Sequence, residues 1–312
     1  MIGVIDHWGI EREKTMNVRQ LEALIWVVRL GSFAAAAAQL NATQSTISLR
    51  IQELEQELGV LLFDRTNRKA HLTAKGRELL AYAEEAVALF SEIRYRIGAR
   101  ESLTGVVRIG VAELVAVTWL PELVSSLHRE YPGLTLELDI SLTANLFTRL
   151  REGNLDVVLI PGGQFDSGLV AQSLGVVEFA WMASPQLEIP EGRLTPTDLS
   201  AWPILSLGEG SYHYGPAEAW LANHRGHRRH TDVCNSMSVI ASLTAAGLGV
   251  SLLPPCCYQS ELAGGRLRVL DTSPEMPEVE FSAVYLKRQP TVIPDLIATA
   301  SQQASTFRQR GG

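Results

Sequence analysis

The chain begins with apolar positions at a spacing that is typical of packed helices. Leu21, Leu24, Ile25 and Val28 recur at intervals of three and four residues, so they would share one face of a helix. Gly31 follows this pattern and predicts the end of the helix. Residues 1–15 show no such pattern, and we expect a disordered extension there.

Two more helices are predicted directly afterwards. Ser32 is a good N-cap for a short alanine-rich helix over 33–40, and Thr43 is a good N-cap for a helix that ends at Gly59. Two helices joined by so short a turn predict a helix-turn-helix. The polar, basic stretch at 64–69 lies between two apolar runs and predicts two short strands, which would form a wing.

A long helix is predicted from Thr73 to about Ile97. Six apolar residues recur at alternating spacings of four and three, as in a heptad seam: Leu79, Ala83, Ala86, Phe90, Ile93 and Ile97. An ordinary amphipathic helix that packs on its own domain would show the same pattern. Because no neighbouring predicted helix could cover the seam, we expect a dimerising helix.

Beyond a hinge at 98–105, strands alternate with helices. Strands are predicted at 106–111, 134–140, 157–160, 179–183, 204–207, 250–253 and 281–286, and helices at 118–131, 145–152, 218–223 and 236–246. Such alternation predicts parallel sheets covered by helices, which is an α/β fold. An uncharged stretch at 233–260 contains polar residues and the pair Pro254-Pro255, so we read it as a helix and a buried strand rather than a membrane span.

Composition and charge refine this picture. The 312 residues are 46% hydrophobic and 20% charged, as in a soluble globular protein of two or three domains, with a net charge of −7. Residues 17–77 carry eight basic and five acidic side chains, so a basic head precedes an acidic body. Three cysteines are too few for a disulfide scaffold, and no secretory signal is expected, so we expect a cytoplasmic protein.

Several motifs of the head occur in a characteristic order and spacing: Val18-Arg19-Gln20-Leu21, Gly31-Ser32-Phe33, Ala36-Ala37-Ala38-Gln39-Leu40, Thr43-Gln44-Ser45-Thr46-Ile47-Ser48, Leu54-Glu55, Glu57-Leu58-Gly59-Val60-Leu61-Leu62-Phe63-Asp64-Arg65-Thr66 and Leu72-Thr73-Ala74-Lys75-Gly76. In these motifs the chain from Met16 onward resembles the LysR-type transcriptional regulators. The resemblance implies a winged helix-turn-helix at 16–73, a linker helix at 74–97 and an effector-binding domain at 106–312. That domain would have two α/β lobes like those of periplasmic binding proteins, lobe I at about 106–177 plus 281–305 and lobe II at about 178–280.

The resemblance also implies which residues contact DNA. They comprise the start of the second helix of the motif and the wing: Thr43, Gln44, Ser45, Thr46, Ser48, Arg50, Arg65, Asn67, Arg68 and Lys69. Basic wing residues suit phosphates, and short polar side chains at a helix N-terminus suit base edges. Many relatives have arginine directly after the last serine, whereas here Leu49 intervenes and displaces the cation of Arg50 by about 100° around the helix.

An effector site is expected in the cleft between the lobes, at loops that follow the strands. The candidate residues are Ala112, Glu113, Leu142, Thr143, Gly162, Ser206, Gly208, Asn235 and Ser236. Family effectors are commonly carboxylates, but Glu113 stands where a hydroxyl residue is more usual. It would repel a carboxylate and suit an amine or a hydroxyl-rich ligand; alternatively it caps its own helix and faces solvent.

We therefore expect a transcriptional regulator that binds interrupted palindromes in promoter DNA as a homodimer or homotetramer. A small-molecule effector would modulate this binding, and we expect no catalytic residues, cofactor, metal or membrane. The alternative is a solute-binding protein without a DNA role. It predicts an export signal and no basic head, and the sequence shows the opposite on both counts.

Two other clusters are weighed and set aside. His224, His227 and His230 could ligate a metal with Asp232, but arginines stand between the histidines and would oppose a cation. The adjacent Cys256-Cys257 could sense oxidants, yet disulfide geometry is difficult for neighbours, and we expect buried inert thiols.

Overall fold

The computed structural model describes residues 16–64, 71–97, 103, 105–222, 230–287 and 292–309. The predicted extension at 1–15 and most of the predicted hinge lie outside the described residues. The chain divides into two compact units, 1–99 and 100–312, and each is treated by itself. Within the described residues, no helix is both long enough and apolar enough to cross a lipid bilayer.

The first unit contains the predicted helices and strands. They are α1 (Val18–Leu30), α2 (Phe33–Gln39), α3 (Gln44–Leu58), β1 (Phe63–Asp64), β2 (His71–Leu72) and α4 (Ala74–Ile97), with β1 and β2 antiparallel. Ser32 and Thr43 cap α2 and α3 as predicted, and Gly31 and Gly59 adopt the left-handed conformation that ends α1 and α3. Asn17 and Gln20 form a capping box at α1.

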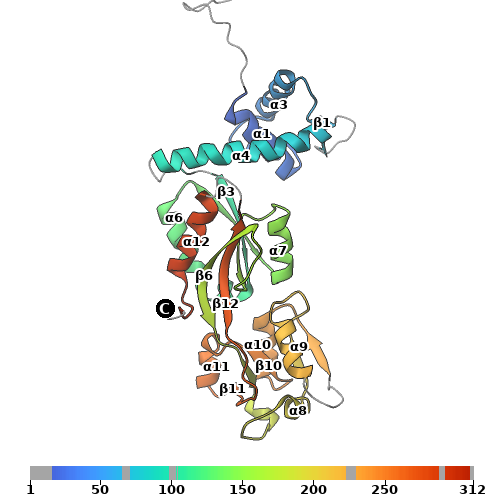
Figure 1. Ribbon diagram of the computed structural model, residues 1–312, viewed down its shortest axis with the longest axis vertical. Coiled ribbons are helices and arrows are strands. Elements are labelled where there is room, and N and C mark those ends of the chain that lie inside the picture. The colour runs from blue at the N-terminus through green and yellow to red at the C-terminus, as the bar shows by residue number, and fades with distance from the viewer. Residues whose placement is uncertain are drawn as a thin grey trace, which may run out of the picture. The chain divides into compact units, whose positions relative to one another are not determined.

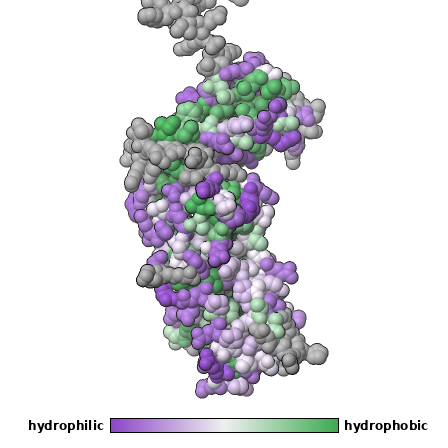
Figure 2. Space-filling view, in the orientation of Figure 1, coloured by the Kyte–Doolittle hydropathy of each residue, from purple (hydrophilic) through white to green (hydrophobic). Residues whose placement is uncertain are grey.

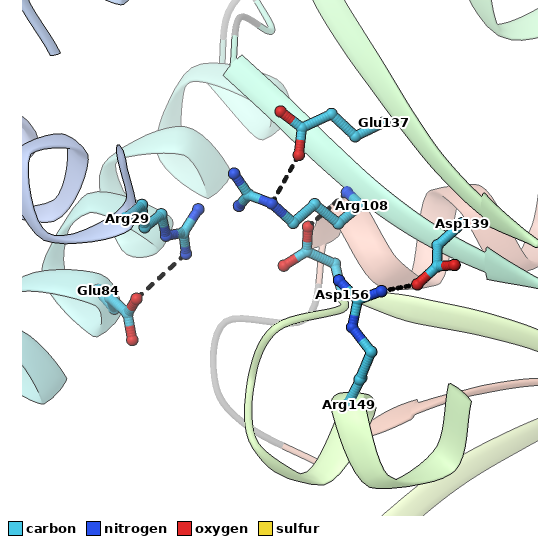
Figure 3. Close-up of polar contacts among 7 residues, drawn as sticks. All are labelled: Arg29, Glu84, Arg108, Glu137, Asp139, Arg149 and Asp156. Carbon is cyan, nitrogen blue, oxygen red and sulfur yellow. Dashed lines mark hydrogen bonds and ion pairs between the residues drawn. The ribbon is translucent and has the colours of Figure 1, made fainter. Parts of the chain in front are cut away.

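The core of this unit joins α1, α2 and α3 to the first half of α4. Leu24, Ile47 and Leu54 are fully buried, and Ala83 of α4 is 1% exposed against them. An ion pair of 3.1 Å between Arg29 and Glu84 also joins α1 to α4 (Figure 3). The expectation that no neighbouring helix covers the seam is therefore wrong for its first half, where α1 packs on it.

Two seam residues beyond Ala86, Phe90 and Ile93, have exposed side chains on this unit. Phe90 is 46% and Ile93 is 48% exposed, and Leu89 and Tyr82 are exposed as well. The space-filling view shows hydrophobic surface on the unit of α1–α4 (Figure 2). Apolar surface of this kind on a helix commonly marks a contact with another chain.

The base of the wing is fixed by a buried carboxylate. Glu55, near the end of α3, accepts hydrogen bonds from the backbone N–H groups of Leu62 at 2.7 Å and Phe63 at 3.2 Å. Thr73 donates its N–H to the carbonyl of Leu62 at 2.9 Å. Its hydroxyl accepts from the N–H of Gly76 and so caps the first turn of α4. Hydrogen bonds thus join α3, the base of the wing and the start of α4.

In the second unit, lobe I is built around a five-stranded sheet. Its elements are β3 (Gly105–Val111), α5 (Glu113–Val117), α6 (Leu120–Glu130), β4 (Leu134–Ile140), α7 (Thr143–Arg151), β5 (Val157–Pro161), β6 (Leu169–Val177), β12 (Val279–Leu286) and α12 (Val292–Ala304). The strand order is β4-β3-β5-β12-β6. Helices α6 and α12 cover one face and α7 covers the other (Figure 1).

Ion pairs fix the parallel strands of lobe I near its β4 edge. The guanidinium of Arg108 on β3 pairs with the carboxylate of Glu137 on β4 at 2.7 Å (Figure 3). The backbone N–H of Arg108 donates to the carboxylate of Asp156 at 2.8 Å. Arg149 of α7 pairs with Asp139 of β4. The parallel ladder sets the register of β3 and β4, to which the pair of Arg108 and Glu137 adds a side-chain contact, so the loops that follow these strands emerge side by side.

Within the described residues, lobe II contains two small sheets. Its elements are β7 (Ala180–Ala183), η2 (Pro185–Leu187), α8 (Pro196–Leu199), β8 (Ile204–Ser206), α9 (Tyr214–Ala222), β9 (Thr231–Val233), α10 (Met237–Ala245), β10 (Ser251–Leu253), η3 (Pro255–Cys257), α11 (Gln259–Ala263) and β11 (Arg268–Val269). Strand β7 lies between β10 and β11 in an antiparallel sheet, and β8 pairs with β9 in parallel.

Three predictions for this unit need correction. The sheets are not wholly parallel, because β12 returns from lobe II and runs antiparallel to β5 and β6. The predicted helix at 118–131 corresponds to α6 alone, and the sequence reading missed α5, which lies before it and ends where Thr118 donates its hydroxyl to the carbonyl of Leu114. The sequence reading also missed β6 and α12.

Replacing Glu55 with alanine tests the base of the wing. The change leaves two buried N–H groups without their acceptor, so we expect a loss of about 1.5–3 kcal/mol in the free energy of unfolding. Hydrogen–deuterium exchange of residues 60–64 should speed up as well. The matched control is Gln56→Ala on the exposed face of α3, which should change stability by less than about 0.5 kcal/mol. Equal effects of the two substitutions would contradict the assignment.

Candidate functional site

The start of α3 presents a polar, accessible surface. Gln44, Ser45 and Ser48 are exposed there, as expected for residues that reach into a groove. Thr43 instead caps the helix: its hydroxyl accepts from the N–H of Thr46 at 3.2 Å and lies 2.8 Å from the hydroxyls of Ser45 and Thr46. Thr43 and Thr46 therefore shape the helix start, which leaves Gln44 and Ser48 as its freer polar side chains.

Leu49 is a surface residue that the sequence reading left out of the site. Its side chain is 54% exposed, whereas Arg50 is only partly exposed. Ser45, Ser48 and Leu49 lie three and four residues apart, so they share one face of α3. The signal for Leu49 was present in the sequence as an apolar residue on a polar helix face.

Arg65, Asn67, Arg68 and Lys69 lie outside the described residues, which include only the strands β1 and β2 on either side of them.

A cavity of about 270 Å³ lies between the two lobes of the second unit. Lobe I contributes the residues that follow β3 and β4, and lobe II contributes the residues that follow β8 and β9. The lining residues are Ala112, Glu113, Leu114, Ile140, Ser141, Leu142, Thr143, Pro161, Leu207, Ser211, His213, Asn235, Ser236, Met237 and Phe281. The volume suits a small metabolite rather than a drug-sized molecule.

Six of the nine predicted effector residues line this cavity: Ala112, Glu113, Leu142, Thr143, Asn235 and Ser236. Ser206 lines a space of about 20 Å³ inside lobe II, which has room for about one water molecule. Gly162 lines a second cavity of about 340 Å³, which also includes Thr143. Gly208 lies against Asn235, because a Cβ there would be 2.8 Å from the Asn235 side-chain oxygen.

His213 is a lining residue that the sequence reading missed. It is buried, and its ring lies 4.1 Å from the ring of Phe179 between centroids. Within the described part of the chain, its ring nitrogens have no hydrogen-bond partner. Burial lowers the pKa of His213 to about 4, so the ring is neutral near pH 7. A neutral imidazole offers a ligand one donor and one acceptor.

Of the two readings of Glu113, the one in which it caps its own helix and faces solvent is wrong. It does not face solvent at its own helix; its carboxylate crosses to lobe II and accepts from the N–H of Met237 at 2.6 Å and of Ser238 at 3.1 Å. The hydroxyls of Ser236 and Ser238 also donate to it, at 2.9 and 2.8 Å. Burial alone would raise the pKa of Glu113, but these four hydrogen bonds outweigh burial and hold the pKa below its usual value.

A second contact joins the lobes on the side of α7. The N–H of Ala144, in the first turn of α7, donates to the carbonyl of Gly210 in lobe II at 3.0 Å. A Cβ at Gly210 would be 3.3 Å from Leu142, so the two segments touch closely. The cavity therefore lies between two sets of hydrogen bonds that connect its walls.

The cysteine pair and the histidine cluster differ in how the structure bears on them. Cys256 is exposed rather than buried, and its sulfur lies 3.7 Å from that of Cys257, with both thiols free. The hydrogen bond between the thiols lowers the pKa of Cys256 to about 7. His224 and His227 lie outside the described residues; within those described, no three ligand-type side chains gather for a metal, and His230 pairs with Asp232 at 2.7 Å.

Two protein-family models match the chain. Residues 18–77 match the model for a bacterial regulatory helix-turn-helix protein of the lysR family. Residues 100–304 match the model for the LysR substrate binding domain. One match falls in each compact unit.

Individual relatives agree with this match along most of the chain. The HTH-type transcriptional regulator CzcR of Bacillus thuringiensis is 28% identical over 284 residues, which is 90% of this chain and 91% of the relative. A probable hydrogen peroxide-inducible genes activator of Mycobacterium leprae is 31% identical over 262 residues, 80% and 82% of the two chains. The fold also matches full-length OxyR of Pseudomonas aeruginosa with a TM-score of 0.70 at 23% identity, covering 96% and 99%. The chain therefore belongs to the LysR family of DNA-binding transcriptional regulators, with an N-terminal helix-turn-helix domain and a C-terminal substrate-binding α/β domain.

Proposed function

We propose that this regulator binds promoter DNA through α3 and the wing, and that a small molecule in the interlobe cavity modulates this binding. The observation that carries the proposal is the cavity itself, because both lobes supply polar groups to it. Thr143 from lobe I and His213 from lobe II both line it, and neither side chain has a hydrogen-bond partner within the described residues. Unpaired polar groups in a pocket are typical of a ligand site.

For the DNA contacts, the exposed face of α3 would enter the major groove. Gln44 and Ser48 have free polar groups that can hydrogen-bond base edges, and Leu49 can contact a thymine methyl group. The wing residues Arg65, Asn67, Arg68 and Lys69 would bind phosphates, which supplies affinity without sequence preference. Binding to DNA implies the cytoplasm as the compartment.

For the response, a ligand that touches both lobes would favour one angle between them. A ligand shifts such an equilibrium only by its difference in affinity for the two arrangements, so groups on both walls of the cavity are needed. The change in angle would alter the spacing of the DNA-binding heads in an oligomer. The effector would be a small metabolite with a carboxylate or an amine.

For assembly, the exposed part of the α4 seam would pair with a second copy. Phe90 and Ile93 are close to half exposed on this helix, together with Leu89. A two-fold dimer binds two half-sites related by the same symmetry, which is the reason to expect an interrupted palindrome. The assembly would be a homodimer or homotetramer.

Substitutions in α3 and in the wing should have different effects on DNA binding. Ser48→Ala or Arg50→Ala should reduce discrimination between operator and random DNA by about 1–3 kcal/mol if a base contact is lost. Arg68→Ala or Lys69→Ala should weaken binding to all DNA alike. The slope of log K against the logarithm of the salt concentration should also become shallower by about 1. Fluorescence anisotropy with both DNAs over a range of salt measures this. Wing variants that change only sequence preference would reverse the assignment.

Charge in the exposed seam should break the assembly. Phe90→Asp or Ile93→Asp would bury an unpaired carboxylate on pairing, so sedimentation should show smaller species and operator binding should fall. The control is Ala81→Asp, which adds the same charge at an exposed position of α4 outside the seam. Full size and full operator affinity in the Phe90 and Ile93 variants would show that this surface makes no essential contact.

Thr143 should report on effector binding. A metabolite screen that follows the melting temperature of the full chain identifies compounds that bind, because binding to the folded state stabilises it. Thr143→Val should then lower the affinity for such a compound by up to about tenfold, because one hydrogen bond is lost. The affinity for operator DNA without the compound should stay the same. Thr148→Val is the control, since its hydroxyl bonds only within α7. A normal response of Thr143→Val to the compound would move the effector site elsewhere.

A further inference from the structure

The first turn of α10 is already occupied by a carboxylate of this chain. The positive end of a helix has free N–H groups that bind anions, and a cleft ligand with a carboxylate could bind there. In this protein Glu113 accepts from the N–H groups of Met237 and Ser238, and the Ser236 hydroxyl accepts from that of Val239 at 3.3 Å. The first three N–H groups of α10 therefore all have partners.

The occupying side chain comes from the opposite wall of the cavity. Glu113 is the first residue of α5 in lobe I, and its partners lie in lobe II more than a hundred positions away in sequence. Ser236 serves both sides of the contact, since its hydroxyl donates to Glu113 and accepts from Val239. The carboxylate thus joins the lobes in the same place that an anionic ligand would otherwise fill.

From this arrangement we infer that Glu113 is a built-in carboxylate that closes the lobes without a ligand, and that the cavity takes an amine-bearing, cationic effector. The inference rests on the proposed effector function of the cavity and narrows the ligand class. An anionic effector would find the donors of α10 taken and would meet a fixed negative charge.

The charges around the cavity support a cation. Among the described residues that line it, none is lysine or arginine, and Glu113 carries the formal charge. The lowered pKa of Glu113 keeps the group ionised at neutral pH, while the depressed pKa of His213 keeps that ring neutral. The adjoining cavity adds another carboxylate, Glu209, and likewise has no lysine or arginine among its described lining residues.

The geometry also leaves room for an ammonium group. A carboxylate has about four acceptor positions, and Oε2 of Glu113 accepts one hydrogen bond, from Met237. The remaining capacity of this oxygen can receive a charged N–H donor. Met237 and Phe281 supply apolar surface for a hydrocarbon chain next to it.

A pair of small probes of equal size and opposite charge tests the inference. Butylammonium chloride and sodium butyrate are titrated against the full chain at constant ionic strength, and the melting temperature gives an apparent Kd for each. For the native protein, butylammonium should bind about tenfold tighter than butyrate. For Glu113→Ala, which vacates the first turn of α10, the preference should reverse. Glu122→Ala removes an exposed carboxylate of α6 and should keep the native preference.

Two results would overturn the inference. One is that butyrate binds the native protein as tightly as it binds Glu113→Ala. The other is that the native protein shows no preference for butylammonium. Should Glu113→Ala fail to fold, Glu113→Gln removes the charge with little change in shape and should abolish the preference for the cation. A failure of the proposed effector function would give a different result. Compounds would then bind the cavity, but none of them would change the affinity for operator DNA.

Discussion

The arrangement of the effector half depends on one carboxylate that crosses between its lobes. Glu113 receives four hydrogen bonds from residues at the start of α10, and its charge sits at the positive end of that helix. The N–H of Ala144 also donates to the carbonyl of Gly210 between the lobes. Glu113 supplies the formal charge among the described lining residues and occupies the donors at the start of α10.

The DNA-binding unit depends on a similar device. Glu55 accepts hydrogen bonds from two backbone N–H groups at the base of the wing, so its buried side chain joins strand β1 to α3. Hydrogen bonds to a carboxylate are directional, so they constrain how the elements that they join can lie. The protein thus uses a buried glutamate in its first unit and a half-buried one in its second to join separate elements.

The sequence predicts the first unit well because its signals are local. Ser32, Thr43 and Gly59 mark helix ends through bonds within a few residues. Lobe I was harder: β6 and α12 depend on the return of β12 between β5 and β6, which is a long-range pairing. Six predicted cavity residues follow strands, as the fold class implies, but His213 lies in the segment between β8 and α9, and the partners of Glu113 lie more than a hundred residues away. Local patterns carry no information about such contacts.

The most direct test of this account is the distance between the lobes. Spin labels at the exposed Ser125 of lobe I and Thr197 of lobe II, attached through an unnatural amino acid so that the native thiols stay free, would report it by double electron–electron resonance. The account predicts a single narrow distribution for the native chain without ligand and a broader, longer one for Glu113→Ala, which sodium acetate would narrow again by refilling the start of α10. Identical distributions for the native chain and Glu113→Ala would contradict it.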